Sequence, residues 1–214
     1  MTVELVIFDC DGVLVDSEPV SDKIIADFLT AHGLPMSPGE VHALFVGGTI
    51  KGLGEEAIRR GATLPDGWHD QLYDLIFARL AEGVPVIAGV FDLLDTLDRA
   101  GVAKAIASNG PLRKMDISLG PSGLWDRFHP RIYSGHDHGP KPAPDMILRI
   151  MADCGVDPDR AVMIDDTATG CRSAQAAGIR CFGYAPDGGA GRFAGTGAEV
   201  ITSLTLVPHL LGLS

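Results

Sequence analysis

Short apolar runs alternate with longer amphipathic stretches along most of the chain. The apolar runs lie at residues 3–8, 102–107, 131–133, 161–164 and 180–184. Nearly continuous apolar runs of this length are typical of parallel strands that are buried on both faces. Strands that alternate with helices form right-handed βαβ units, which place helices on both sides of the sheet. The pattern therefore predicts an α/β fold, with a Rossmann-like parallel sheet as the middle of three layers, α/β/α.

The alternation is interrupted once, between residues 16 and 82, where the hydrophobic period is helical throughout. The first amphipathic face includes Ile24, Ile25 and Phe28, and it stops before Gly33. Further helices are predicted near residues 38–45, 50–60 and 67–82. This segment predicts a small α-helical cap domain, residues 16–82, inserted into a core domain that is made of residues 1–15 and 83–214.

Composition and charge narrow the class of protein. The chain has 214 residues, with 17 Lys and Arg against 28 Asp and Glu, which gives a formal charge of −11. Without a basic patch such a chain repels a polyanion, so nucleic acid is not an expected partner. The four cysteines form no CxxC pair, no apolar run approaches the ~20 residues that span a bilayer, and the N-terminus lacks a basic signal segment. These features predict a cytoplasmic protein that binds no membrane.

Carboxylates are concentrated directly after two of the predicted strands. Asp9 and Asp11 follow the first strand, and Asp165 and Asp166 follow the fourth. Each pair alone has a plain interpretation, because Asp-Gly is a common turn and Asp is a common helix N-cap. However, the carboxyl ends of parallel strands meet at one edge of the sheet, and Mg²⁺ prefers carboxylate oxygens. Two acidic strand ends in one sheet therefore favour a bound Mg²⁺.

Two further groups are expected near the same edge. Ser108 and Asn109 follow the second strand and can bind phosphate oxygens, although a Ser-capped turn explains them better when they are taken alone. Lys141 lies among three prolines that stiffen the backbone, which suits a cation held near developing negative charge. Lys114, a few residues after Ser108, is more typical of a surface cation.

The order of these groups, Asp-x-Asp-Gly, Ser-Asn, Lys-Pro-x-Pro-Asp and Asp-Asp, resembles the motif order of the haloacid dehalogenase superfamily. The resemblance covers essentially the whole chain and extends to the branch whose helical cap lies between the first and second motifs. It implies that Asp9 is a nucleophile that forms an aspartyl-phosphate, and that Asp11 is a general acid and base. It also implies that Ser108, Asn109 and Lys141 bind the phosphoryl group.

The resemblance further implies how a metal is held. Mg²⁺ is expected to bind Asp9, the backbone carbonyl of Asp11 and Asp166, with Asp165 bound directly or through water. The superfamily's haloacid dehalogenases lack an acid at the place of Asp11. Its presence therefore argues for phosphoryl transfer rather than cleavage of a carbon–halogen bond.

The implied function is Mg²⁺-dependent hydrolysis of a small phosphorylated metabolite by a monomer or weak homodimer. Residues 108–115 and 133–137 are similar to the corresponding segments of bacterial 6-phosphogluconate phosphatases, which implies a sugar or sugar-acid phosphate, with 6-phosphogluconate as a candidate. Specificity is expected in the cap. There Lys51, in the glycine-rich stretch 45–52, is a candidate ligand for a substrate carboxylate or hydroxyl, although a solvated Lys beside a turn is the plainer interpretation.

Three alternatives stay open. A sugar phosphomutase similar to β-phosphoglucomutase would use the same motifs, but Ser21 stands where that branch has a His, which favours hydrolysis. A receiver-like signalling domain also combines Mg²⁺, Asp and Lys on a parallel sheet, but its acidic pair belongs to the first strand and it has no helical insert. A catalytically silent phosphate-binding protein is disfavoured because no motif residue is missing.

Overall fold

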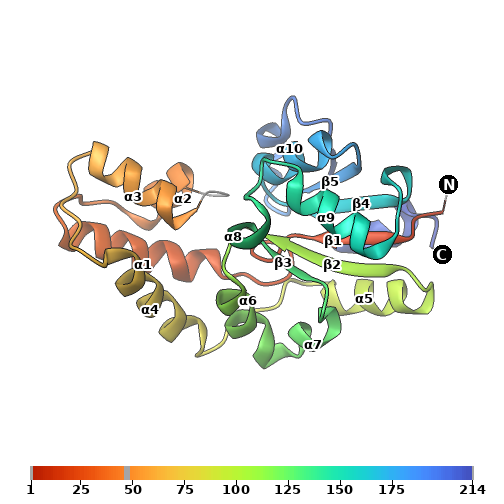
Figure 1. Cartoon of the computed structure of the whole chain (residues 1–214), viewed down its shortest axis with the longest axis horizontal. Coiled ribbons are helices and arrows are strands. Elements are labelled where there is room, and N and C mark those ends of the chain that lie inside the picture. Colours follow the sequence, from red (N-terminus) through yellow and green to blue (C-terminus); the bar gives the residue numbers. More distant parts are fainter. Residues whose placement is uncertain (1, 46–48, 214) are drawn as a thin grey trace.

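The computed structural model describes residues 2–45 and 49–213, in which six parallel strands form one sheet (Figure 1). The strand order is β3-β2-β1-β4-β5-β6. The first strand therefore lies between β2 and β4, with Phe8 opposite both Ile106 and Ile164. The strands span Leu5–Phe8 (β1), Ala103–Ser108 (β2), Ile132–Ser134 (β3), Ala161–Asp165 (β4), Arg180–Tyr184 (β5) and Glu199–Ile201 (β6).

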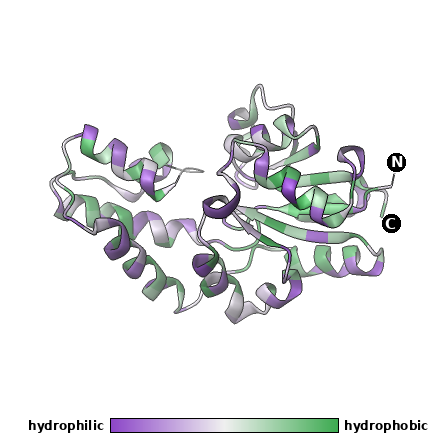
Figure 2. Ribbon diagram, viewed as in Figure 1, coloured by the Kyte–Doolittle hydropathy of each residue, from purple (hydrophilic) through white to green (hydrophobic). Residues whose placement is uncertain are grey.

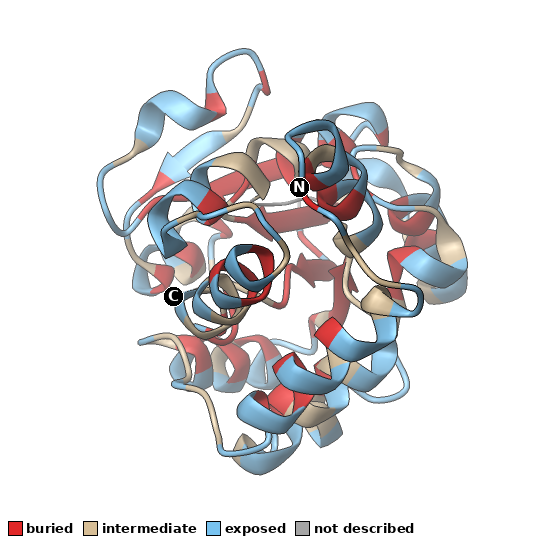
Figure 3. Ribbon diagram, turned by 90° about the vertical axis from the view of Figure 1, so that its left-hand side faces the viewer, coloured by how far each residue is buried: buried red, intermediate tan, exposed pale blue. Residues whose placement is uncertain are grey.

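Helices cover both faces of the sheet, because successive side chains of a strand point to opposite sides. Val6 and Phe8 belong to a hydrophobic cluster with residues of α5, α6, α7 and α11, whereas Leu5 and Ile7 belong to a second cluster with residues of α9 and α10. Figure 3 shows the buried residues gathered in the strands and on the inward sides of the helices. These helices span Val90–Arg99 (α5), Leu112–Leu119 (α6), Leu124–Phe128 (α7), Asp145–Cys154 (α9), Ala168–Ala176 (α10) and Val207–Leu210 (α11).

The predicted three-layer architecture and the five predicted strands are confirmed, and the sheet has one strand more than predicted. β6 is a three-residue strand at the edge of the sheet, and two of its residues are exposed. Such a strand contains no long apolar run, so the hydrophobic pattern does not predict it. No helix within residues 2–45 and 49–213 is long and apolar enough to cross a membrane.

Between β1 and α5, four helices form the predicted helical insert (Figure 1). They span Glu18–Ala31 (α1), Pro38–Phe45 (α2), Ile50–Arg59 (α3) and Trp68–Leu80 (α4). Their apolar sides form a hydrophobic cluster apart from the two clusters of the sheet. Figure 2 shows hydrophobic residues concentrated in the strands, with further groups on the cap helices. The cap thus has a core of its own, and the boundaries 16–82 stay a prediction.

Close packing inside the cap depends on one glycine. A Cβ on Gly54 of α3 would lie 2.2 Å from Cζ2 of Trp68, the first residue of α4. The start of α3 is fixed by Thr49, whose hydroxyl accepts a hydrogen bond from the Gly52 N–H at 3.1 Å. These two contacts orient α3 and so determine which of its side chains face the core.

Two linkers join the cap to the core, and they run side by side. Val15 and Val86 form an antiparallel bridge between them. The backbone N–H of Asp16 donates a hydrogen bond to the carbonyl of Pro85 at 2.9 Å. The two crossings between cap and core are therefore paired rather than independent.

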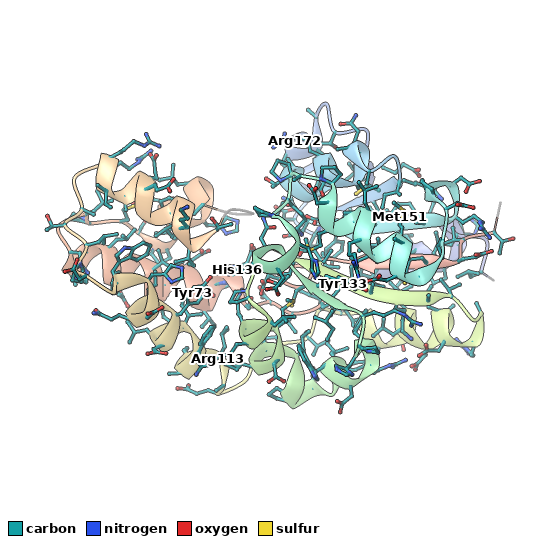
Figure 4. The ribbon with its side chains drawn as sticks, in the orientation of Figure 1. Tyr73, Arg113, Tyr133, His136, Met151 and Arg172 are labelled. Atoms are coloured by element: carbon teal, nitrogen blue, oxygen red, sulfur yellow. The ribbon has the colours of Figure 1, made fainter. Side chains whose placement is uncertain are left out.

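A second contact between the two parts lies between α4 and α6. The guanidinium carbon of Arg113 is 5.0 Å from the centre of the Phe77 ring, and Figure 4 labels Arg113 near this junction and Tyr73 on the cap. This cation–π contact joins the cap to the helix that follows β2.

Candidate active site

Four chain segments bring polar side chains together where the central strands end. Asp9 follows β1, Ser108 is the last residue of β2, and Asp165 is the last residue of β4. Lys141 comes from the loop between α8 (Gly135–His138) and α9. The carboxyl ends of these neighbouring strands meet at one edge of the sheet. All four residues are buried, so the predicted motifs form one enclosed site.

Lys141 lies between two carboxylates. Its Nζ donates to Asp9 Oδ1 at 2.7 Å and to Asp165 Oδ2 at 2.8 Å. Burial raises the pKa of Asp9 to about 7, an effect that Lys141 partly offsets and Asp165 reinforces. Burial alone would lower the pKa of Lys141, but Asp165 and Asp9 hold it above its usual value. Lys141 therefore stays charged and compensates the acids around it.

The side chain of Asn109 holds the Lys141 loop in place. Its Oδ1 accepts from the backbone N–H of Lys141 at 2.7 Å, and its Nδ2 donates to the carbonyl of the same residue at 3.2 Å. Gly135 allows this approach, since a Cβ there would lie 2.9 Å from Pro140 Cα and 3.0 Å from Asn109 Oδ1. The Asn109 side chain thus positions Lys141, and its contact with a phosphoryl group stays a prediction.

The start of α10 orients Asp165. Its Oδ1 accepts from the backbone N–H of Thr167 at 2.9 Å and from the hydroxyl at 2.7 Å. The same hydroxyl accepts from the Gly170 N–H at 3.0 Å, so Thr167 is the N-cap of α10. A Cβ on Gly170 would lie 1.8 Å from Asp165 Oδ2. Asp165 therefore faces Lys141 instead of capping the helix, and glycine at 170 leaves it the space to do so.

Asp9, Asp165 and Asp166 form a cluster that fits a divalent cation. One carboxylate oxygen of each lies within 4.8 Å of the others. Asp166 Oδ1 is buried without a hydrogen-bond partner among the described residues, and burial together with Asp165 and Asp9 raises the pKa of Asp166. Gly12, with φ of 78°, makes room for this carboxylate, because a Cβ there would lie 2.2 Å from Asp166 Oδ2. Converging hard oxygens of this kind are the donors that Mg²⁺ prefers.

The carboxylate of Asp11 is held by other partners. Its Oδ1 accepts from the Ser17 hydroxyl, and its Oδ2 accepts from Lys114 Nζ at 2.6 Å. Burial alone would raise the pKa of Asp11, but Lys114 and Ser17 hold it below its usual value. A metal contact through the backbone carbonyl of Asp11 stays a prediction.

The interpretation of Lys114 as a surface cation is wrong. Only 15% of its side chain is exposed, and it forms an ion pair with Asp11 inside the site. The sequence feature that could have placed Lys114 near the site is its position in the first turn of α6, which begins at Leu112 shortly after Ser108. That proximity places a long side chain next to the Ser108-Asn109 loop, but it does not reveal that the partner of Lys114 is Asp11.

A cavity of about 140 Å³ lies between these motifs and the cap. Its lining on the core side includes Asp9, Asp11, Ser108, Asn109 and Lys141. Its lining on the cap side comes from α1, from α4 and from the region where α2 ends and α3 begins. Ser21, on α1, is one of these cap residues. The cap therefore covers the site and supplies one wall of the space next to it.

Lys51, the candidate ligand of the cap, does not reach this cavity. It is exposed in the first turn of α3, and the loop residues 46–48 of the same predicted stretch lie outside the described residues. Ile50 and Leu53, three residues apart on one face of α3, line the cavity. A neighbouring residue in a helix is rotated by about 100°, which directs Lys51 elsewhere. Lys51 is therefore not among the residues that line this cavity, and its contact with a substrate stays a prediction.

Comparison with known proteins places this site in a family. Residues 3–178 match the family of haloacid dehalogenase-like hydrolases. The match covers most of the chain and includes all four motifs, so the chain belongs to this family. It is a hydrolase, and phosphatases are among its relatives.

Three similar proteins illustrate the relationship. A 6-phosphogluconate phosphatase of Escherichia coli (strain K12) is 28% identical over 188 residues, covering 86% of this chain and 84% of that protein. Phosphoglycolate phosphatase 1 of Pseudomonas aeruginosa is 31% identical over 193 residues, covering 84% and 70%. A solved structure of a haloacid dehalogenase-like protein of Agrobacterium tumefaciens has a TM-score of 0.82 and 34% identity, and covers 98% of both chains. The similarity thus includes the helical insert.

Proposed function

We propose that this protein is a Mg²⁺-dependent phosphatase that hydrolyses a small phosphorylated metabolite through an aspartyl-phosphate on Asp9. The observation that carries the proposal is the position of Asp9, buried beside Lys141 and open to the cavity under the cap. A sugar phosphate or a sugar-acid phosphate is the proposed substrate class. Relatives named for 6-phosphogluconate and phosphoglycolate support a small phosphate ester.

The chemistry needs one nucleophile and one proton carrier. An oxygen of Asp9 attacks phosphorus, and the bond between phosphorus and the leaving oxygen breaks while Asp11, which must carry a proton when the ester is bound, gives that proton to the leaving oxygen. The leaving group departs as an alcohol. A water molecule then loses a proton to Asp11 and attacks the aspartyl-phosphate, which releases inorganic phosphate and restores Asp9. Both carboxylates line the cavity where the ester would lie, which supports this division of roles.

Other core residues would bind and orient the phosphoryl group. Lys141 supplies a fixed positive charge, because Asn109 holds its backbone and two carboxylates hold its Nζ. The Ser108 oxygen accepts from the Gly110 N–H at 3.1 Å, which directs the hydroxyl proton elsewhere for donation to a phosphoryl oxygen. Phosphoryl transfer depends mainly on positioning and charge stabilisation, so a short set of residues suffices.

A divalent metal fits the cluster of Asp9, Asp165 and Asp166, and these are the residues that would hold it. Mg²⁺, when bound, supplies the positive charge that lets a carboxylate approach a phosphate dianion. Thr167 and Lys141 keep Asp165 oriented toward that position. Within residues 2–45 and 49–213, Oδ1 of Asp166 has no hydrogen-bond partner, which leaves it available to such a metal.

Replacement of the nucleophile tests this proposal. Asp9→Asn should lower phosphate release from p-nitrophenyl phosphate by at least ~10³-fold, because the amide cannot form the covalent intermediate. Asp92→Asn, which changes an exposed acid on α5, serves as the control and should keep the wild-type rate. Wild-type turnover by correctly folded Asp9→Asn protein would contradict the mechanism.

A sugar phosphomutase is the alternative with the same chemistry. Ser21 lines the cavity, and the resemblance aligns it with a position at which the phosphomutase branch carries a His. A hydroxyl is a poor general acid or base near neutral pH, which favours hydrolysis. Incubation with a hexose 1-phosphate separates the two reactions, since a phosphatase releases inorganic phosphate and a mutase forms the 6-phosphate isomer.

A further inference from the structure

The cap side of the cavity combines apolar and acidic residues. Ile25, Leu53 and Ile76, from three different helices, form apolar parts of this wall. Glu18, Ser21 and Asp22 lie on one face of α1, because residues three and four apart share a face of a helix. Among the described residues, the cap contributes no Lys or Arg to the lining of this cavity.

Both cations that line the cavity come from the core, and both are already bound by carboxylates. Lys141 contacts Asp9 and Asp165, and Lys114 contacts Asp11. A second anionic group on a substrate would therefore enter the cavity without a cation of its own. It would also lie in a wall where isolated charge is poorly solvated, which is costly.

The acids of α1 make that position less favourable still for an anion. Asp22 contacts His42 Nδ1 at 3.0 Å, and Glu18 lies 3.9 Å from the same nitrogen. His42 belongs to α2 and is exposed, so it interacts with these carboxylates from outside the cavity. The field that a leaving group meets from α1 is therefore negative whenever Glu18 or Asp22 is ionised.

One polar atom on this wall has no partner. The Ser21 Oγ is buried and makes no hydrogen bond to any described residue. A buried hydroxyl without a partner is costly, so it favours a ligand that brings a hydroxyl of its own. Ser21 thus points to a substrate with neutral hydrogen-bonding groups next to an apolar surface.

We propose that the cap selects phosphate monoesters whose leaving group is an uncharged polyol or sugar, and that Glu18 and Asp22 exclude esters with a second anionic group. This inference rests on the proposed phosphatase function and narrows its substrate class to the sugar phosphates.

Arg59, a cation of the cap, would oppose this selectivity if it bound the second anionic group of a substrate. It lines a neighbouring cavity of about 540 Å³ together with Asn109 and Lys141. Its guanidinium is bound to Glu56 in the same helix, and its side chain is 73% exposed. An exposed, paired Arg offers an anion little affinity. Arg59 nevertheless supplies a sharp control, because an anionic substrate that used the cap would need it.

Two esters that differ in one group provide the test. Glucitol 6-phosphate and 6-phosphogluconate share a carbon chain and differ only in a hydroxymethyl group or a carboxylate at its end. The wild-type protein with Mg²⁺ should show at least ~10-fold higher kcat/KM for glucitol 6-phosphate, which corresponds to about 1.4 kcal/mol. Glu18→Gln/Asp22→Asn should bring the ratio toward one by raising kcat/KM for the carboxylate ester.

Two controls keep the interpretation specific. Asp27→Asn removes an exposed acid from the opposite side of α1 and should leave the ratio unchanged. Arg59→Gln should also leave it unchanged. Equal or better hydrolysis of 6-phosphogluconate by the wild-type protein would overturn the inference, and so would a selective loss of that activity in Arg59→Gln. A preference above ~10-fold for an ammonium-bearing ester, glucosamine 6-phosphate over glucose 6-phosphate, would overturn it too.

Binding separates this inference from the function on which it rests. The affinities of Asp9→Asn protein for the same two esters, measured by calorimetry with Mg²⁺, should show the same preference without turnover. If neither ester is hydrolysed by the wild-type protein but glucitol 6-phosphate binds more tightly, the phosphatase proposal fails and the selectivity stands. If the wild-type protein hydrolyses these esters but the two bind equally tightly, the phosphatase proposal stands and the proposed selectivity fails.

Discussion

The core and the cap border the same cavity but arrange charge in opposite ways. On the core side, Lys141 and Lys114 are each held by carboxylates. On the cap side, Glu18 and Asp22 stand beside apolar residues, and their contact is a partly exposed His42. Under the proposed function, the core would bind the phosphoryl group, which every such ester shares, and the cap would contact the part that differs. The contrast indicates that reaction and selectivity can be altered separately.

Among the variants that test this contrast between core and cap, the largest effect is expected from removal of the central cation of the core. Lys141→Met should lower kcat by about 10²–10³-fold, because a preorganised charge at the phosphoryl group is lost. It should also lower the free energy of unfolding by roughly 3–5 kcal/mol, since Asp9 and Asp165 lose their buried partner. Phosphate release and urea unfolding measure these effects. Lys51→Met, at an exposed cap position, is the control, and a loss of the same size there would contradict the separation of roles.

Substitution of two glycines tests the contrast between core and cap by changing packing without changing any charge. Gly170→Ala should displace Asp165 and reduce turnover of p-nitrophenyl phosphate by about 10²-fold, because small misplacements of reacting groups are costly. Gly54→Ala should instead push α3 from α4 and destabilise the cap by about 1–3 kcal/mol, while this small ester is still hydrolysed.

Gly39→Ala is the control for both glycine variants, since its added Cβ would meet nothing within 4 Å. Steady-state kinetics together with thermal unfolding distinguishes the two outcomes. An equal loss of p-nitrophenyl phosphate turnover in both variants would mean that cap and core do not act separately.

Metal binding should stabilise the core through Asp166. At a Mg²⁺ concentration about 100 times its Kd, the wild-type protein should gain about 2.7 kcal/mol, or roughly 5–10 °C in Tm. Asp166→Asn should lose this gain, and in EDTA it should be at least as stable as wild type because repulsion with Asp9 and Asp165 is relieved. Calorimetry in EDTA and in Mg²⁺ gives both values, and an undiminished Mg²⁺ effect in the variant would exclude the proposed ligand set.

The smallest effect concerns the acids of the cap. Burial raises the pKa of Glu18 from 4.5 to about 7, with Asp11 and Asp22 adding to the shift and His42 and Lys114 opposing it. The folded protein therefore binds the Glu18 proton more tightly than the unfolded chain does. The contribution of Glu18 to the free energy of unfolding should fall as the pH rises from 4.5 to 7 and should level off above that.

The corresponding variant isolates this contribution. Between pH 4.5 and 7, the free energy of unfolding of Glu18→Gln should fall by about 1–2 kcal/mol less than that of the wild type, as measured by urea unfolding at each pH. Asp27→Asn, an exposed acid in the same helix, should keep the wild-type profile. A profile of Glu18→Gln that parallels the wild type between pH 4.5 and 7 would show that Glu18 ionises normally.

The sequence predicts most of the core site because its chemistry follows strand ends. Once the strands at Asp9, Ser108 and Asp165 are recognised, parallel pairing alone brings their carboxyl ends to one edge. Lys141 is recognisable from its stiff proline-rich surroundings. The strand β6 escapes prediction because it is short, exposed and preceded by a glycine-rich segment without a hydrophobic period.

The cap is less predictable because its chemistry depends on how its helices are turned. The spacing of Glu18, Ser21 and Asp22 shows that they share a face of α1, but not that this face borders the cavity. Lys51 was predicted as a substrate ligand with the same uncertainty about helix orientation. In the structure, Ile50 and Leu53 of the same helix line the cavity and Lys51 does not. Helix orientation follows from packing between distant segments, and a local pattern carries no information about it.

The paired linkers have a mechanical consequence. Two hydrogen-bonded crossings form one ribbon, so any movement of the cap relative to the core would bend both connections together. Val15 of this ribbon also bridges to Asp11, only four positions earlier in the chain. Such a movement would also displace the backbone next to the proposed proton carrier, Asp11. Admission of the ester and alignment of the group that protonates it would then be a single movement.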